Sequence, residues 1–411
     1  METKEKTKKK KKESWCKFRH KVVISLIRPF FHPYVRWKYG IRVEKFRESK
    51  DRPYLILLNH QTAFDQFFVG LAFKNPVYYV ATEDIFSMGW VSSLIRWLVA
   101  PIPIKKQTTD VAAVMNCIRV AREGGTICIA PEGNRTYSGR TEYMNPAIAG
   151  LARKLKLPIL LFRIEGGYGV QPRWSDGTRR GKMRAYVSRV IEPEEAAAMD
   201  NDTLLAQIRE GLYVDEAVAD ARFKSEKRAE YLERAVYVCP WCGLSAFESK
   251  GNRIRCCTCG KTVEYGADKS LKGVDCDFPF PFVKQWYDYQ QSYVNELDVT
   301  AMTEKAAFTD RADVSKVILN HRKEPFRADS AISLYGDRVV IDEGTQQALV
   351  LPFGEVEAVS VLGRNKLNIY YGKDVLQFKG SPHFNALKYV NFYYRYKNIV
   401  RGNADGKFLG I

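Results

Sequence analysis

A histidine and an aspartate five residues apart, His60 and Asp65, have the spacing and chemistry of a proton-transfer pair. Imidazole is the side chain best suited to move a proton near neutral pH, and a carboxylate on its other nitrogen would stabilise the imidazolium. Residues five apart on one continuous helix point about 140° away from each other. The pair can therefore meet only if His60 precedes a helix whose first turn holds Asp65. Residues 54–58 favour a buried strand before His60, and residues 67–73 favour a helix after Asp65.

Asp65 also has a structural interpretation. Thr62 and Asp65 match the Ser/Thr-x-x-Glu/Asp box that begins helices, with Thr62 as the N-cap residue. The two roles are compatible, because a carboxylate in the first turn can face back toward the loop. The alternative for His60 is a loop histidine bonded to backbone. No comparable partner pattern surrounds the other four histidines, which are His20, His32, His321 and His383.

A second motif, residues 131–136 (Pro-Glu-Gly-Asn-Arg-Thr), follows another apolar run at residues 127–130. With the first segment it resembles the glycerophospholipid acyltransferase family. That family carries a histidine, four residues and an aspartate, and then a Pro-Glu-Gly-Thr-Arg-Ser type block downstream. Each motif alone is weak, but in this order, each at the end of a predicted strand, they are specific. Asn134 stands where the family usually has threonine, which leaves the acceptor preference open.

The resemblance implies a membrane-surface O-acyltransferase of phospholipid biosynthesis. Such an enzyme moves a fatty acyl group from a thioester of coenzyme A or acyl carrier protein to the free hydroxyl of a lysophospholipid. His60 would be the general base, Asp65 would orient it, and no catalytic metal is implied. The expected acceptor is 1-acylglycerol 3-phosphate, which would give phosphatidate. Glycerol 3-phosphate, another lysolipid and an aminolipid remain alternatives.

The resemblance also implies a site for the acceptor phosphate. Arg135 would hold the phosphate, and Glu132 and Gly133 would shape the pocket. Lys105 or Lys106 would assist, because they follow an apolar run where the family has a strand ending in a basic residue, usually arginine. Lysine binds phosphate as a point charge, without the bidentate fork of arginine. The alternative for both lysines is a solvated pair at a strand end.

Positive charge is concentrated at the N-terminus. The chain has a formal net charge of +18, and residues 1–50 contain 17 Lys and Arg against 5 Asp and Glu. Residues 15–37 interleave aromatic and aliphatic side chains with basic ones, as in a helix that lies in a lipid interface. Pro29 and Pro33 are expected to break this helix into two pieces. We predict that it binds an anionic membrane surface; the alternative is an ordinary amphipathic helix packed on the core.

No apolar run reaches the roughly 20 residues that a membrane span requires. The longest candidate, residues 88–104, is interrupted by Arg96 and two prolines. Residues 22–27 are too short for the apolar part of a signal peptide. We therefore expect a peripheral protein at the cytoplasmic face of the cell membrane.

Four cysteines have the spacing of a zinc ribbon. Cys239 and Cys242 form one C-x-x-C pair, Cys256 and Cys259 form another, and thirteen residues separate the pairs. A glycine follows each pair and permits the tight knuckle in which backbone amides point at thiolates. We predict that the four thiolates bind a structural Zn²⁺, with Cys257 as a spare. Disulfides and free thiols are the alternatives, and an intracellular chain disfavours disulfides.

The chain is long enough for two or three domains, and its pattern predicts their order. A basic amphipathic segment (1–50) precedes an α/β acyltransferase domain with a mainly parallel sheet flanked by helices (51–235). A small zinc ribbon (236–268) and a linker (269–310) follow. Short strands from residue 317 and one closing helix at 384–396 resemble a pleckstrin-homology-like β-barrel domain (311–405).

A second class of function is a non-catalytic protein that binds nucleic acid or lipid, because zinc ribbons and basic tails are common in nucleic-acid machinery. The ribbon here has few basic residues, and the basic run is distant in sequence and interleaved with aromatics. That pattern favours lipid, so no nucleic-acid partner is expected.

Overall fold

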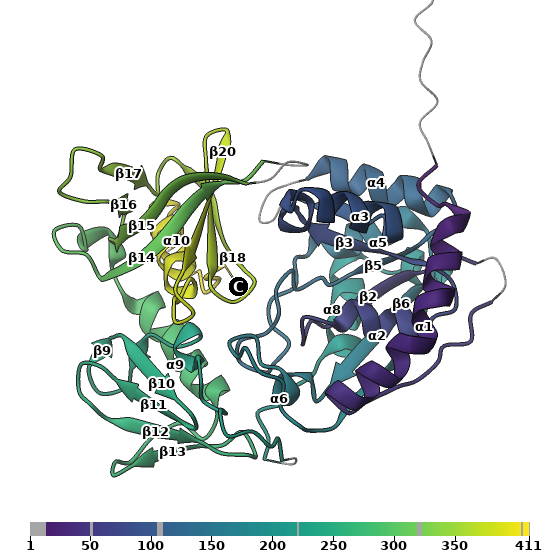
Figure 1. The fold of residues 1–411 in the computed structure, drawn as a ribbon. Helices are drawn as coiled ribbons and strands as arrows, with labels where there is room; N and C mark the ends of the chain where they lie inside the picture. Colours follow the sequence, from purple (N-terminus) through teal and green to yellow (C-terminus); the bar gives the residue numbers. More distant parts are fainter. Residues whose placement is uncertain are drawn as a thin grey trace, which may run out of the picture.

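Three groups of elements make up the protein in a computed structural model, which describes residues 14–49, 52–104, 110–219, 222–318, 323–403 and 406–410. Figure 1 shows a sheet flanked by helices, a small cysteine-containing module and a C-terminal antiparallel sheet with a final helix. The predicted α/β fold class with two smaller β modules is confirmed.

The first sheet has seven strands in the order β1-β7-β6-β2-β5-β3-β4. Neighbouring strands are parallel except for the antiparallel pair β6 and β7. The central strand β2 is buried at all four positions, as expected for a strand covered on both faces. The strands are β1 (Ile41–Val43), β2 (Leu55–Leu58), β3 (Val77–Thr82), β4 (Ile102–Ile104), β5 (Thr126–Ile129), β6 (Ile159–Glu165) and β7 (Met183–Ile191).

Helices cover both faces of this sheet. Alternate side chains of β2 point to opposite faces, so Ile56 packs with α1 and α2 whereas Leu57 packs with α4, α5 and α8. The helices are α1 (Phe18–Tyr39), α2 (Asp65–Ala72), α3 (Trp90–Val99), α4 (Val111–Arg122), α5 (Ala147–Leu155), α6 (Gly167–Val170), α7 (Pro193–Ala198) and α8 (Asn201–Leu212).

Helix α1 runs unbroken through Pro29 and Pro33, so the prediction of two pieces was wrong. Its two halves are anchored on the same body of the protein, since His20 and Val35 are both buried. Arg28, the residue before Pro29, donates hydrogen bonds to the backbone carbonyl of Gly70 in α2 and to that of Lys74 just after α2. These tertiary contacts offset the helix hydrogen bonds that the prolines cannot make.

The charged residues 194–235 have a pattern typical of helix, but only the first part of this segment is helical, in α7 and α8. The helix ends at Leu212, and the chain then pairs with another loop: the amide of Thr141 donates to the carbonyl of Val214, and that of Glu216 to the carbonyl of Gly139. Only a short 3₁₀ turn, Leu232–Arg234, follows among the described residues up to 235. After Leu212, backbone hydrogen bonds to residues 139–141 therefore take the place of helical hydrogen bonds.

The cysteine module contains a two-stranded and a four-stranded antiparallel sheet. Its strands are β8 (Val238–Cys239), β9 (Gly243–Leu244), β10 (Phe247–Lys250), β11 (Arg253–Cys256), β12 (Thr262–Tyr265) and β13 (Leu271–Val274). Helix α9 (Val283–Glu296) follows, and its buried Trp286 and Tyr287 join a core shared with this module.

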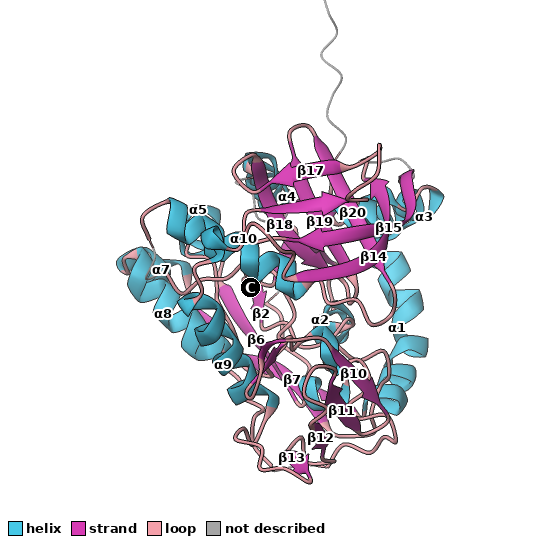
Figure 2. Cartoon of the chain, turned by 90° about the vertical axis from the view of Figure 1, so that its left-hand side faces the viewer, coloured by secondary structure: helices cyan, strands magenta, loops and turns pink. Residues whose placement is uncertain are grey.

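The C-terminal sheet is antiparallel, with strand order β17-β16-β15-β14-β20-β19-β18, and lies above the cysteine module in Figure 2. Its first strand begins before residue 317, where the strand pattern was predicted to start. The elements are β14 (Phe308–Lys316), β15 (Glu324–Leu334), β16 (Arg338–Ile341), β17 (Leu349–Pro352), β18 (Val356–Leu362), β19 (Lys366–Tyr371), β20 (Asp374–Gly380) and helix α10 (Leu387–Val400). One core cluster joins this sheet, α9 and the cysteine module.

Candidate active site

His60 and Asp65 meet at the carboxyl end of β2. His60 lies in the loop after that strand, Asp65 is the first residue of α2, and His60 Nδ1 lies 2.8 Å from Asp65 Oδ2. The carboxylate of Asp65 also accepts hydrogen bonds from the amides of Gln61 and Thr62 and from the Thr62 hydroxyl. Since a carboxylate is an acceptor, His60 Nδ1 donates, and Nε2 is left with a lone pair that can take a proton.

Thr62 is not the N-cap residue that the sequence predicted. Helix α2 begins at Asp65 with Phe64 at the N-cap position, and no side chain caps it. The predicted contact between Thr62 and Asp65 is present, but it lies in the turn before the helix. The Thr62 hydroxyl donates to Asp65 Oδ1 and accepts from the Phe64 amide at 3.1 Å. Asp65 therefore organises the His60 loop rather than the helix end.

Side chains from distant segments hold this loop in place. Asn59 pairs with both backbone groups of Ile164 on β6, at 2.8 and 2.7 Å. Gln61 Oε1 accepts from the amide of Tyr168, and Gln171 Oε1 accepts from the amide of Ala63. The sequence did not single out the side chains of Asn59, Gln61 and Gln171, because each of these contacts spans more than 100 residues and no local pattern signals it.

Glu132 braces the same loop from the second motif. Its Oε1 accepts from the His60 amide at 2.9 Å, and its Oε2 accepts from the Glu142 amide at 3.0 Å. Burial raises the pKa of Glu132 to about 8, although these two amides act in the opposite direction. Gly133 adopts a φ of 65° in the turn that follows, a conformation that favours glycine. The predicted role of both residues in shaping a phosphate pocket stays a prediction.

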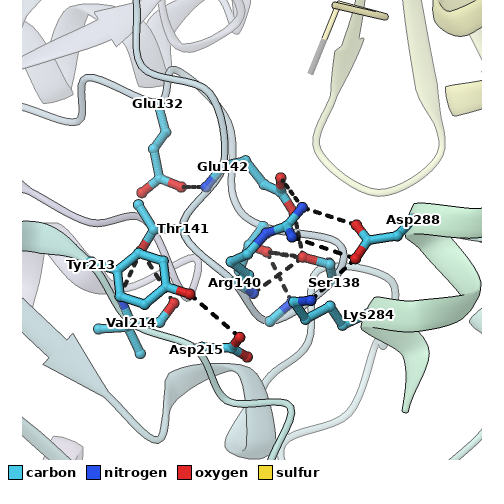
Figure 3. Close-up of polar contacts among 12 residues, drawn as sticks. Glu132, Ser138, Arg140, Thr141, Glu142, Tyr213, Val214, Asp215, Lys284 and Asp288 are labelled. Carbon is cyan, nitrogen blue, oxygen red and sulfur yellow. Dashed lines mark hydrogen bonds and ion pairs between the residues drawn. The ribbon is translucent and has the colours of Figure 1, made fainter. Parts of the chain in front are cut away.

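A polar network continues from Glu132 to α9, outside the first sheet (Figure 3). Arg140 lies 3.3 Å from a Glu142 carboxylate oxygen and 3.0 Å from Oδ1 of Asp288 on α9. Lys284, one turn earlier on α9, pairs with the same Asp288 at 3.1 Å. The loop that carries the second motif is thereby tied to the helix that packs on the cysteine module.

Arg135 is buried beside the His60 loop, since the amide of the next residue, Thr136, donates to the His60 carbonyl at 3.2 Å. Its backbone carbonyl accepts from Arg173, but its own Nη1 is buried without a hydrogen-bond partner among the described residues. Burial lowers the pKa of Arg135 to about 9, and the charges of Arg173 and Arg364 act in the same direction. A buried guanidinium with an open donor suits an anionic ligand.

The two lysines predicted to assist Arg135 cannot be placed. Strand β4 ends at Ile104, and Lys105 and Lys106 lie outside the described residues. Their role in phosphate binding stays a prediction.

The four predicted cysteines form one cluster. The sulfur atoms of Cys239, Cys242, Cys256 and Cys259 all lie within 4.8 Å of one another, and two of the four residues are buried. The glycines after the pairs have φ angles of 77° and 74°, as the predicted knuckles require. Four converging thiols are the donor set that structural zinc prefers. The exposed spare, Cys257, is outside the cluster.

Large apolar side chains are exposed along α1 and its neighbours. Among the described residues, no helix has the length and apolar content needed to cross a bilayer. Helix α1 contacts both α2 and α3, and Phe31 packs against Phe67 with tilted rings whose centroids lie 4.7 Å apart. The outer surface of these three helices exposes Phe18, Leu26, Phe30, Trp37, Phe67, Trp90, Leu94 and Trp97; we call it the aromatic face.

Comparison with known proteins bears on the first sheet and its site. Residues 40–165, which include both motifs, match the Acyltransferase family model. These residues therefore carry an acyltransferase domain, and both candidate acid–base residues lie within it.

Two curated relatives are plant chloroplast proteins. The chain is 23% identical over 170 residues to the 1-acyl-sn-glycerol-3-phosphate acyltransferase LPAT1 of Arabidopsis thaliana, covering 40% of this chain and 47% of that protein. It is 23% identical over 152 residues to the corresponding BAT2 protein of Brassica napus, covering 36% and 43%. The chain thus spans less than half the length of either relative.

A solved structure is also similar, namely the 1-acyl-sn-glycerophosphate acyltransferase PlsC from Thermotoga maritima. The TM-score is 0.40 at 22% identity, over 47% of this chain and 79% of that one.

Proposed function

We propose that the protein is an O-acyltransferase that esterifies a lysophospholipid, with 1-acylglycerol 3-phosphate as the preferred acceptor. The observation that carries this proposal is the His60–Asp65 pair beside the buried Arg135: Nδ1 of His60 lies 2.8 Å from Oδ2 of Asp65, and Nε2 has no hydrogen-bond partner among the described residues. The match of residues 40–165 to acyltransferases and the names of the two plant relatives support it.

In the proposed reaction, the acceptor hydroxyl oxygen attacks the carbonyl carbon of an acyl thioester on coenzyme A or acyl carrier protein. Nε2 of His60 takes the hydroxyl proton, the new C–O bond forms, and the C–S bond breaks. The proton then passes from His60 to the departing thiolate, so a free thiol and an ester are the products. Asp65 stabilises the imidazolium between these two proton transfers, and general-base catalysis of this kind is typically worth about 10²–10⁴-fold.

The acceptor class can be tested with the intact protein and acyl-coenzyme A. We expect kcat/KM to be highest for lysophosphatidate, lower for glycerol 3-phosphate and lowest for monoacylglycerol, because only the first combines an acyl chain with a phosphate. Equal rates with lysophosphatidate and monoacylglycerol would point to a phosphate-free acceptor or an aminolipid.

Arg135→Ala should raise the KM for lysophosphatidate by roughly ten- to hundredfold, because a charge-assisted hydrogen bond to phosphate is lost. Arg135→Lys should restore part of the binding, since lysine keeps the charge but lacks the fork. Arg311→Ala, an exposed arginine of the C-terminal sheet, is the matched control. An unchanged KM in a folded Arg135→Ala protein would remove this residue from the phosphate site.

We infer that the aromatic face, with the basic residues of α1, binds an anionic membrane surface and brings the site to its lipid acceptor. Phe30, Trp37 and Trp90 are 80%, 81% and 76% exposed, so their burial in an interface would be favourable. The lysine run at the start of the chain, which adds charge, lies outside the described residues. Location at the cytoplasmic face of the cell membrane stays a prediction.

Replacing Phe30, Trp37 and Trp90 by alanine should weaken binding to anionic vesicles at least about tenfold. Vesicle co-sedimentation across a salt series measures it, and Phe326→Ala, a partly exposed aromatic of the C-terminal sheet, is the control. Substitution is preferable to deleting α1, because Val35 and Tyr39 belong to the core. Undiminished binding of the triple variant would place the membrane contact elsewhere.

The two remaining modules have structural and binding roles in this proposal. The cysteine cluster would bind one Zn²⁺ through Cys239, Cys242, Cys256 and Cys259, as a zinc ribbon does. The curled seven-stranded sheet closed by α10 supports the pleckstrin-homology-like interpretation of the C-terminal part. The predicted domain boundaries are kept as part of the proposal.

A further inference from the structure

The C-terminal sheet contributes an arginine to the surroundings of Arg135. Arg364 lies in the tight turn between β18 and β19, where Gly363 has a φ of 59°. The side chain of Asn365 donates to the carbonyl of Gly380 at 3.0 Å and fixes this turn. The turn reaches the acyltransferase unit, because Arg364 Nη1 lies 3.1 Å from Oδ1 of Asp176. Figure 1 shows the two units side by side.

The loop that Arg364 contacts, residues 173–176, also forms hydrogen bonds with the second motif, residues 131–136. Arg173, three residues before Asp176, is 2% exposed. Its Nη1 donates to the carbonyl of Arg135 at 2.9 Å, and its Nη2 donates to Oδ1 of Asn134 at 3.0 Å. A continuous chain of contacts therefore leads from Arg364 through residues 173–176 to Arg135.

Asp176 does not need Arg364 for neutralisation. Arg234, itself 2% exposed, forms a bidentate pair with Asp176, with Nη1 2.6 Å from Oδ1 and Nη2 3.2 Å from Oδ2. Arg364 contributes a single contact to this carboxylate, and its side chain is 31% exposed. Its other guanidinium donors have no partner among the described residues. Arg364 can therefore turn toward an anion while the Asp176 carboxylate stays paired with Arg234.

The charge that remains around Arg135 is positive. Arg173 and Arg364 are the cations that act on Arg135, whereas Asp65 is the carboxylate that opposes them. Asp65 is occupied by His60, and both carboxylate oxygens of Glu132 are occupied by the amides of His60 and Glu142. Two buried donors, Arg135 Nη1 and Arg173 Nε, lack a partner among the described residues. A phosphate monoester, with a charge of about −1.5 to −2 at pH 7, would neutralise this cluster.

We propose that Arg364, supplied by the C-terminal sheet, binds the acceptor's phosphate monoester together with Arg135 and Arg173. This inference rests on the proposed function, because the anion is the acceptor's own phosphate. Arg173 and Arg364 lie outside the residues that match the acyltransferase family. The C-terminal sheet thereby completes the acceptor site and selects a phosphate-bearing acceptor over an uncharged one.

The test compares two acceptors in the full-length protein. Arg364→Ala should raise the KM for lysophosphatidate roughly ten- to hundredfold, leave the KM for acyl-coenzyme A unchanged, and leave transfer to monoacylglycerol unchanged. Arg364→Gln should behave like Arg364→Ala, because glutamine can still donate to Asp176 but carries no charge. Lys373→Ala removes an exposed cation from the turn at the other end of β19. It should change neither the KM for lysophosphatidate nor the KM for acyl-coenzyme A.

Three outcomes would overturn the role of Arg364. A wild-type KM for lysophosphatidate in both Arg364 variants would show that this side chain does not bind the acceptor. An equal loss with both acceptors, together with a lower unfolding temperature, would make Arg364 a structural brace to Asp176. Normal kinetics in Arg364→Gln but not in Arg364→Ala would show that the hydrogen bond, not the charge, matters. If the wild-type protein acylates only uncharged acceptors, the proposed function itself fails.

Discussion

His60→Ala should reduce acyl transfer by about 10²–10⁴-fold while the protein remains folded. Within the part of the chain that the structure describes, the His60 side chain makes one hydrogen bond, at 2.8 Å to Asp65, and Asp65 retains its three other donors in the variant. Turnover with a short-chain soluble acceptor and thermal unfolding should be measured together, so that membrane binding does not enter. Residual activity above about 10% would be incompatible with a general-base role of this size.

Two further variants sharpen this result. Asp65→Asn should also lose most activity, because an amide can present its NH₂ group to Nδ1 and favour the wrong tautomer. It should cost stability as well, since the Gln61 and Thr62 amides share the same carboxylate. His32→Ala, which removes an exposed histidine of α1, should keep full activity with the soluble acceptor. Loss of activity in His32→Ala would show that the assay reports general damage.

Cys239→Ser should abolish zinc binding and lower the unfolding temperature by more than about 10 °C. Zinc binding to such thiolate sites is worth about 10–16 kcal/mol in isolated zinc-finger peptides at pH 7, and one kcal/mol shifts the midpoint of a small domain by about 4–8 °C. The effect should spread, because the module shares its core with α9 and the C-terminal sheet. Elemental analysis and calorimetry of the purified variant measure both effects.

The spare cysteine provides the matched control. Cys257 is exposed and adjacent to the proposed ligand Cys256, but its sulfur is not part of the cluster. Cys257→Ser should therefore keep one zinc per chain and wild-type stability. Full zinc in Cys256→Ser would mean that Cys257 is the ligand instead.

The contact between His60 and Asp65 could be predicted from sequence because both residues are local to one strand–loop–helix segment. The spacing of His60 and Asp65 allows contact only across the start of a helix, and the structure has that arrangement. The cysteine cluster was equally predictable, since the glycines after each pair fix the knuckles.

The surroundings of the pair could not be predicted, because they depend on long-range packing. Glu132 contacts the His60 amide across 72 residues, and Arg364 reaches Asp176 across 188. Helix propensity also gave a wrong prediction in α1, where tertiary contacts dominate. Pro29 and Pro33 predicted a broken helix, yet the burial of His20 and Val35 holds α1 as one helix.

The most direct test of the central claim is the fate of a labelled acyl group. The purified full-length protein, incubated with acyl-coenzyme A labelled in its acyl chain and with lysophosphatidate, should form labelled phosphatidate and free coenzyme A thiol in equal amounts. His60→Ala should form neither above background. Thiol release without any labelled ester would mean that water, not a lipid hydroxyl, is the acceptor and would contradict the account. No acyl transfer to any hydroxyl acceptor would contradict it as well.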